Sequence, residues 1–275
     1  MKPLSRKIAA SMAVLLLIIV LGTGCQSVPK TTIQQDDTLY QVSLLNALML
    51  GEYDGFIPVS TLQQKGDIGI GTFDTLDGEM IMLDTVVYKA KATGEVFVVD
   101  PDVTVPFAVV TTFDADMPVL QVKNVGDLDA LKKLLDGMIA QNGNDFNCFY
   151  VARIGGTFSL AHVRSVPAQE KPYKRLSEIA ATQKEFIYEN LEGTIVAFRC
   201  PDYVEGINLP KWHLHFLSAD MAKGGHLLDA NLSQGNVQID TIREFNLVLP
   251  ENNSFAQMDI ANDLSRETSK VEGKK

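Results

Sequence analysis

The sequence Trp212-His213-Leu214-His215-Phe216, followed after a short loop by Gly224-Gly225-His226, predicts a β-hairpin that carries three of the four histidines of the chain. Successive side chains of a β-strand point to opposite faces, so His213 and His215 share one face and the apolar residues around them form the other. The intervening loop is rich in turn formers and can bring His226 opposite His215 or near it. The segment therefore indicates a β-rich fold with a compact histidine cluster.

The three clustered histidines have the spacing of a metal site. Three neutral imidazoles that leave one coordination position open are typical of catalytic zinc. We therefore predict Zn²⁺ as the cofactor, with His213, His215 and His226 as its ligands, although sites of this kind also accept other divalent ions. A lone strand histidine is more often a packed or surface residue, and this is our interpretation of the distant His162.

The composition limits the function classes. A chain of 275 residues suits one large domain or two small ones, and an apolar fraction of 46% is sufficient for a hydrophobic core. The formal charge is −10, and no tract of basic residues is interleaved with aromatic ones. Because nucleic-acid binding depends on clustered Lys and Arg, we expect no nucleic-acid partner.

The N-terminus has the pattern of an export signal. Lys2, Arg6 and Lys7 precede an apolar run over 8–20, which is short compared with the about 20 residues of a membrane span. The small residues before Cys25 resemble a bacterial lipoprotein cleavage site, although the large apolar residue lies four positions before the cysteine rather than three. Cleavage nearby and an uncleaved anchor are the alternatives. We expect an exported protein, tethered to a membrane through lipidated Cys25 or secreted.

Two further cysteines lie in apolar, strand-like segments. An exported protein could pair Cys148 with Cys200. We favour two buried thiols, because buried free cysteine behaves as a small hydrophobic residue. The two residues lack the C-x-x-C spacing of a structural zinc site.

The hydrophobic pattern predicts a mixed α/β (α+β) fold with two domains, each built on a mixed or antiparallel sheet with flanking helices. The predicted division is a signal peptide over 1–24, a polar tether over 25–38, an α/β domain over 39–168 and a zinc-binding, β-rich domain with a C-terminal tail over 169–275. Helices are expected over Val42–Leu50, from a capping box at Ser60, over Val125–Ala140 with Asp127 as its cap, and from Ser177 to about Tyr188. Strands are expected over Glu79–Leu83, Val86–Tyr88, Val96–Val99, Pro106–Phe113, Cys148–Ile154, Phe158–Arg164, Thr194–Cys200, Lys211–Ser218, His226–Leu232, Val237–Ile242 and Glu244–Leu249. From Ser254 onward the polar composition predicts a mobile tail.

A histidine-only zinc site keeps a positive charge, which suits a substrate with two chelating oxygens and an oxyanion or enolate that develops on one of them. Such chemistry also needs a cation for a carboxylate and an acid that delivers a proton. Arg164, at a strand end, and Glu79, between a glycine turn and an apolar strand, are candidates. By position alone, each is more often a solvated residue.

Eight segments in consistent order resemble the alpha-acetolactate decarboxylase family, and together they span roughly residues 40–260. They are LNALMLG (45–51), GDIGIGT (66–72), LDGEMI (76–81), PFAV (106–109), GTF (156–158), VRSVP (163–167), HLHF (213–216) and GGH (224–226). The resemblance implies a zinc enzyme, usually a homodimer of two-domain α/β subunits, that converts (S)-2-acetolactate to (R)-acetoin and CO₂.

The resemblance also implies roles for single residues. The three clustered histidines match the zinc ligands, and Thr72 matches a threonine that lines the site. Glu79 and Arg164 match the active-site glutamate and arginine. The family also brings a tail glutamate to the metal, for which Glu272 is a better match than Glu267.

These roles imply a mechanism. The zinc ion chelates the ketone and hydroxyl oxygens of acetolactate and stabilises an enediolate. Arg164 orients the substrate for loss of CO₂. Glu79 or the tail glutamate then delivers the proton to one face.

Two other classes stay open. One is another three-histidine zinc enzyme, such as a carbonic anhydrase, although here the third histidine follows after only eleven residues. The metallo-β-lactamase motif H-x-H-x-D-H is absent, since position 217 is Leu. The other class is a non-catalytic zinc-binding surface lipoprotein, which would explain the histidines and the N-terminus but not Glu79 and Arg164.

Overall fold

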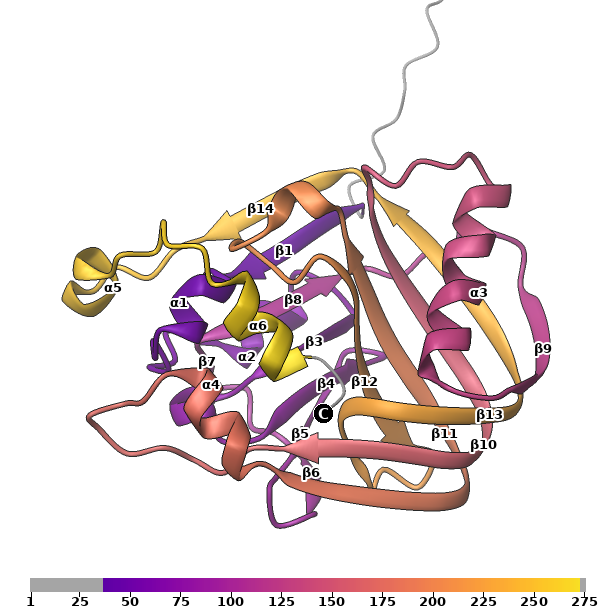
Figure 1. Cartoon of the computed structure of the whole chain (residues 1–275), viewed down its shortest axis with the longest axis horizontal. Coiled ribbons are helices and arrows are strands. Elements are labelled where there is room, and N and C mark those ends of the chain that lie inside the picture. The colour runs from indigo at the N-terminus through magenta and orange to yellow at the C-terminus, as the bar shows by residue number, and fades with distance from the viewer. Residues whose placement is uncertain (1–36, 273–275) are drawn as a thin grey trace, which may run out of the picture. The chain divides into compact units, whose positions relative to one another are not determined.

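Two large β-sheets and a few short helices make up the computed structural model, which describes residues 37–272 (Figure 1). This arrangement confirms the predicted mixed α+β class. The predicted signal peptide, Cys25 and nearly all of the predicted tether lie outside the described residues. Within residues 37–272, none of the helices combines the length and the hydrophobicity that crossing a bilayer requires.

The first sheet has seven strands, and all its pairings are antiparallel except that of β1 with β14. In spatial order they are β14 (Glu244–Val248), β1 (Thr38–Val42), β8 (Phe107–Thr111), β3 (Ile68–Thr72), β4 (Glu79–Leu83), β5 (Val86–Ala90) and β6 (Val96–Val98). A separate pair consists of β2 (Ile57–Pro58) and β7 (Thr104–Val105).

The second sheet is antiparallel and contains the longest strands. In spatial order they are β10 (Phe149–Ser165), β11 (Lys184–Cys200), β12 (Lys211–Ser218), β13 (Gly224–Ile242) and β9 (Leu120–Val125). Because β13 also pairs with β10 along most of its length, the four strands β10 to β13 form a closed cycle of hydrogen-bonded neighbours. The predicted hairpin is confirmed as β12 and β13, which place His215 directly opposite His226.

The helices are short apart from α3 (Leu128–Gln141). They are α1 (Leu45–Met49), α2 (Val59–Gln63), α4 (Leu176–Ile179), α5 (Asn253–Gln257) and α6 (Ser265–Glu272), with 3₁₀ turns η1 (Asp74–Leu76), η2 (Ala180–Thr182) and η3 (Asp202–Val204). As predicted, Asp127 caps α3, because its carboxylate accepts a hydrogen bond from the backbone N–H of Ala130.

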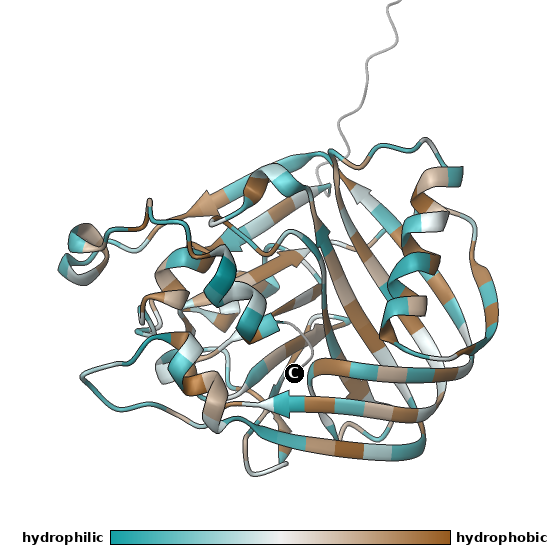
Figure 2. Ribbon diagram, viewed as in Figure 1, coloured by the Kyte–Doolittle hydropathy of each residue, from teal (hydrophilic) through white to brown (hydrophobic). Residues whose placement is uncertain are grey.

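Two of the buried hydrophobic clusters lie on the two faces of the second sheet. On one face, buried residues of α3 such as Leu131 and Leu135 pack against Trp212, Leu214 and Phe216 of β12. On the opposite face, residues of both sheets form a second buried cluster, in which Ile81 and Leu217 take part. Hydrophobic and hydrophilic bands alternate along the long strands, as expected for strands of this kind (Figure 2). The histidine face of β12 therefore points toward the first sheet.

The predicted interruption of a strand at Gly155-Gly156 is wrong, since β10 runs through both glycines without a break. A Cβ atom at Gly156 would collide with the backbone of Gln234, so glycine here permits close approach of β13 rather than a turn. The two strands predicted within 226–242 are likewise one strand, β13.

The helix predicted from Ser177 to about Tyr188 is also wrong. The observed helical segment consists of α4 and η2 and ends at Thr182, and β11 begins at Lys184. Residues Phe186 and Tyr188 pack against the core from this strand, and pairing with β10 along nearly all of β11 outweighs the local helical pattern.

The predicted domain boundary between residues 168 and 169 stays a prediction, but the two sheets do not follow it. β9 and β10 precede this point and share a sheet with β11 to β13, whereas β14 follows it and pairs with β1. The tail that composition predicts to be mobile instead forms α5 and α6, and Leu264 and Val271 are buried there. Cys148 and Cys200 are free and buried, as we favoured.

Candidate active site and metal centre

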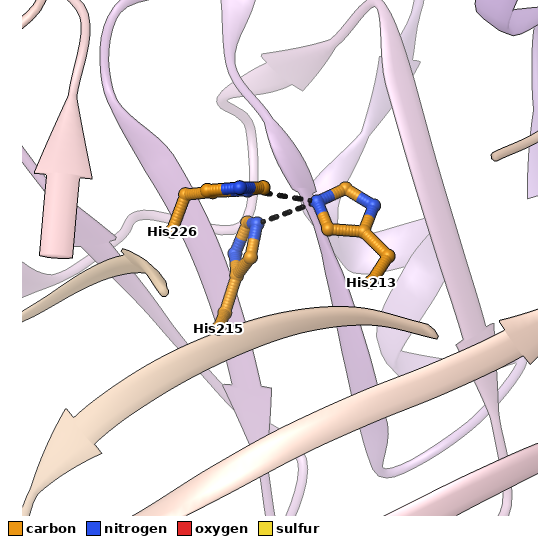
Figure 3. A group of neighbouring side chains, drawn as sticks. All are labelled: His213, His215 and His226. Carbon is orange, nitrogen blue, oxygen red and sulfur yellow. Dashed lines mark hydrogen bonds between the residues drawn. The ribbon is translucent and has the colours of Figure 1, made fainter. Parts of the chain in front are cut away.

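The β12–β13 hairpin brings the three histidine rings into contact (Figure 3). His213 Nε2 lies 3.0 Å from His226 Nδ1 and 3.2 Å from His215 Nε2. One ring nitrogen from each residue lies within 4.8 Å of the others, so the three histidines could hold a metal ion. The alternation along β12 and the cross-strand pairing of His215 with His226 produce this convergence.

The environment keeps these histidines neutral. Burial lowers the pKa of His213 to about 3, and burial also places the pKa values of His215 and His226 well below the ordinary value, with the neighbouring histidines and Arg164 adding to the effect. His215 Nδ1 lies 2.8 Å from the carbonyl oxygen of Met80, which can only accept a hydrogen bond. The proton of His215 is therefore on Nδ1, and the lone pair of Nε2 faces the cluster.

Two glutamates approach the histidines from different elements. Glu79, the first residue of β4, has its Oε2 3.7 Å from His215 Nε2. Glu272, the last residue of α6, has its Oε2 3.3 Å from His226 Nε2 and 4.0 Å from His213 Nε2. This Glu272 oxygen is buried and has no hydrogen-bond partner within residues 37–272.

Burial raises the pKa of Glu79 to about 7, against the opposing effect of the Arg164 cation, while the Glu272 carboxylate raises it further. Glu79 is therefore protonated in a large part of the molecules at neutral pH. A carboxyl group that holds a proton at this pH inside a cavity can act as a general acid.

Arg164 is a buried cation near the C-terminal end of β10, and only 4% of it is exposed. Its Nη2 donates to Glu272 Oε1 at 3.1 Å, and its Nη1 donates to Gln183 Oε1 at 3.1 Å. The Nε atom is buried and has no partner among the described residues. A guanidinium group that is fixed at two nitrogens and keeps a free donor can bind an anionic ligand.

The predicted site residues line one cavity of about 50 Å³. They are Thr72, Glu79, Arg164, His213, His215, His226 and Glu272, and the other lining residues are mainly apolar. Thr72 pairs with Glu79 across β3 and β4, and its hydroxyl donates to the carbonyl oxygen of Gly78 at 2.7 Å. Residues from both sheets and from α6 thus meet at a single point.

Glu267, the alternative tail residue, does not lie at the cluster. Its carboxylate accepts hydrogen bonds from Arg175 Nη1 at 2.6 Å and from Ser177 Oγ at 3.0 Å. His162 is also elsewhere, where its ring contacts Glu185 at 2.9 Å.

Two contacts of the site are absent from the sequence predictions. Gln183 lies within the helix wrongly predicted from Ser177, and recognising the alternating pattern of 184–188 as a strand would have moved it to a strand end near Arg164. The carbonyl of Met80 orients His215, and a backbone group of this kind leaves no signal in the sequence.

Comparison with known proteins identifies the family. The family model for alpha-acetolactate decarboxylase matches residues 39–262. An alpha-acetolactate decarboxylase of Methanosarcina mazei is 41% identical over 245 residues, which cover 89% of this chain and 83% of the relative, and one of Brevibacillus brevis is 35% identical over 239 residues, covering 87% and 82%. The crystal structure of alpha-acetolactate decarboxylase from Bacillus subtilis strain 168 superposes with a TM-score of 0.82 at 34% identity, covering 86% of this chain and 99% of that one.

The fold, the cavity and these relatives define a carboxy-lyase of mixed α+β architecture. The chain belongs to the alpha-acetolactate decarboxylase family, whose reaction is the decarboxylation of acetolactate to acetoin. The resemblance found in the sequence is thereby confirmed. The segment matched by the family model ends before α6, so it does not include Glu272.

Proposed function

We propose that the protein decarboxylates (S)-2-acetolactate to (R)-acetoin and CO₂ in the cavity beside the histidine cluster, with Zn²⁺ as the metal. The observation that carries this proposal is the convergence of a cation, a carboxyl group whose pKa is raised to about 7 and three neutral imidazoles on one small cavity. The cation can bind a carboxylate, the imidazoles can hold a metal ion that stabilises developing negative charge, and the carboxyl group can deliver a proton.

The residues fit a zinc ion. Three neutral histidines are the ligand set of open zinc sites, and the buried Glu272 Oε2 without a hydrogen-bond partner is a suitable fourth donor. His213, His215 and His226 would hold the ion, and the carbonyl of Met80 would keep His215 in the tautomer that binds metal. A bound zinc ion supplies Lewis-acid stabilisation of negative charge on the ketone and hydroxyl oxygens of the substrate.

Arg164 binds and orients the substrate. Its buried Nε, which has no partner within residues 37–272, can donate to the anionic substrate, whose carboxylate is its most basic acceptor. Apolar side chains such as Leu76, Phe107 and Val166 line the same cavity and exclude water from it. Loss of CO₂ is favoured in such surroundings, because the carboxylate gives up its charge.

Glu79 supplies the proton. When the bond to the carboxylate carbon breaks, its electron pair moves toward the neighbouring ketone, and the carbon that has lost CO₂ then takes up one proton. The pKa of Glu79 is raised to about 7, so a large part of the molecules carry a proton on this residue at neutral pH. Glu79 also lies next to the cluster, whereas the Glu272 carboxylate is paired with Arg164. Delivery from the fixed position of Glu79 would reach one face only and would set the configuration of acetoin.

The test is an assay of the purified, zinc-loaded protein with racemic acetolactate. We expect rapid formation of acetoin, with the (R) enantiomer in excess by chiral chromatography, and no acceleration of CO₂ hydration. The reference is a variant with His213→Ala and His215→Ala, which reports the spontaneous reaction. Acetoin formation at the same rate in both proteins would exclude the proposal, and accelerated CO₂ hydration would favour a carbonic anhydrase activity.

The proposal extends to location and assembly. The charged and apolar pattern that precedes Cys25 supports export, with a lipid anchor on Cys25 or release of the protein. The family resemblance supports a homodimer. Retention in the membrane fraction that is lost in Cys25→Ser would indicate the anchor, and light scattering after gel filtration would measure the mass of the assembly.

A further inference from the structure

Arg164 is linked to the protein surface by a chain of side-chain hydrogen bonds. Its Nη1 donates to Gln183 Oε1 at 3.1 Å, and Gln183 Nε2 donates to Glu185 Oε1 at 2.7 Å. The other oxygen of Glu185 lies 2.9 Å from His162 Nε2. This chain joins the buried cation of the cavity to an exposed region of β10 and β11.

Gln183 and Glu272 hold the guanidinium group at different nitrogens. Glu272 accepts from Nη2, and Gln183 accepts from Nη1, while Nε has no hydrogen-bond partner among residues 37–272. The long side chain of an arginine has many rotamers, and two hydrogen bonds at separate nitrogens restrict both its position and the plane of the group. Gln183 is thus the contact that complements Glu272 in fixing Arg164.

The neutral amide of Gln183 suits this place. A second carboxylate against Arg164 would compensate its positive charge and would compete with an anionic substrate. The amide oxygen accepts a hydrogen bond without adding charge. Its NH₂ group donates to Glu185, so the side chain of Gln183 lies between the Glu185 carboxylate and the Arg164 cation.

We propose that Gln183, held in place by Glu185 and His162, is a positioning and specificity-determining residue that presents Arg164 to the carboxylate of a small anionic substrate. The proposal rests on the decarboxylation proposed above. The segment between η2 and β11, which carries Gln183, would then help to orient the substrate. This role is separate from those of the histidines and of the two glutamates of the site.

The experiment compares Gln183→Leu, which removes the acceptor, with Gln183→Glu, which replaces the neutral acceptor by a charged one. We expect Gln183→Leu to lower kcat/KM for acetolactate by about 10- to 100-fold, as is usual for loss of a residue that orients a ligating or catalytic group. Gln183→Glu should instead act mainly on KM, because the new carboxylate competes with the substrate. Gln169→Leu is the matched control, since Gln169 has similar exposure and its side-chain amide donates to the Pro167 carbonyl, away from Arg164.

A second readout does not depend on turnover. The anion 2-hydroxy-2-methylpropanoate has the carboxylate and hydroxyl groups of the substrate but no ketone, so it cannot react in this way. Calorimetry should give a dissociation constant at least about 10-fold higher for both Gln183 variants than for the wild-type protein and Gln169→Leu. Wild-type protein that binds this anion but forms no acetoin would contradict the proposed function, and weaker binding by both Gln183 variants would in that case still support the role of Gln183.

The outer part of the chain is tested by Glu185→Gln, which preserves hydrogen bonding but removes the charge. A smaller loss of kcat/KM than in Gln183→Leu, about 2- to 5-fold, would support a role of Glu185 through Gln183. The proposal is wrong if Gln183→Leu stays within about twofold of the wild type in both kcat/KM and anion affinity, or if Gln169→Leu loses as much as Gln183→Leu. Thermal melting of each variant checks that its fold is retained.

Discussion

Burial sets the protonation states of the titratable residues of the site. Burial keeps His213, His215 and His226 neutral. It also raises the pKa of Glu79 to about 7, so that a large part of the molecules carry a proton on Glu79 at pH 7, where a glutamate in water would be ionised. The opposite tendencies have one cause, because desolvation disfavours whichever form is charged. Among residues 37–272, Arg164 is the only cation that lines the cavity, and it is paired with Glu272.

Glu79→Gln should retain the fold and the metal but lose the proton donor. We expect kcat to fall by about 10²- to 10⁴-fold, the usual contribution of general acid catalysis. Zinc content, measured by atomic absorption, should stay equal to that of the wild type, because three histidines remain. Glu95→Gln, which changes an exposed glutamate on the β5–β6 turn, is the control. Equal turnover in the two variants would show that Glu79 is not the acid.

Asp240 of β13 is a buried carboxyl group outside the site, and only 1% of it is exposed. Its Oδ2 accepts the backbone N–H of Asp114 at 3.1 Å, whereas its Oδ1 has no hydrogen-bond partner in the described part of the chain. Burial raises the pKa of Asp240 to about 7, and the nearby Asp116 raises it further. The unfolded chain releases this proton near pH 4, so the folded state loses stability as the pH rises from about 4 to about 7.

Asp240→Asn removes this titration and keeps an acceptor for the Asp114 amide. We expect the variant to be more stable than the wild type by about 1–3 kcal/mol at pH 8, and the difference to shrink toward pH 4. Urea denaturation at pH 4, 6 and 8 measures it, with Asp100→Asn as an exposed control. A difference between variant and wild type that is the same at all three pH values would contradict the assigned pKa.

At the scale of elements, the sequence predicts best where a single face is buried. The alternation of apolar and polar residues predicts β12 with its observed bounds, Lys211–Ser218. The apolar face of α3 predicts a helix whose ends lie within a few residues of the observed ends. Prediction fails at Gly155-Gly156 and at β11, where pairing with distant strands decides the structure. A local pattern contains no information about those partners.

The helix α6 carries Glu272 into the site, and burial of Val271 beside it anchors the last turn. We expect Glu272→Ala to lower turnover while zinc content stays normal, because Arg164 loses one of its two anchors and the three histidines remain. Ser269→Ala, on the exposed face of the same helix, should behave like the wild type. Unchanged turnover in Glu272→Ala, measured together with its zinc content, would remove this residue from the site.

At the scale of the whole described chain, the site is assembled from elements far apart in sequence. The histidines come from one hairpin, and their local spacing is sufficient to predict that they cluster. Glu79, Arg164 and Glu272 come from β4, β10 and α6, so only the family resemblance could group them in advance. Gln183 was missed because it depends on the correct start of β11 and has no motif of its own.

Because one metal ion would join β12 to β13 and to α6, its removal should affect the stability of the whole fold. Free zinc at about 100 times its dissociation constant should stabilise the folded state by about 2.7 kcal/mol relative to the chelated protein. Differential scanning calorimetry with zinc and with EDTA measures this as a higher melting temperature in zinc. Magnesium, which prefers oxygen ligands, should produce no shift. His162→Ala should keep the zinc response and His215→Ala should lose it, whereas an equal response in both variants would place the metal elsewhere.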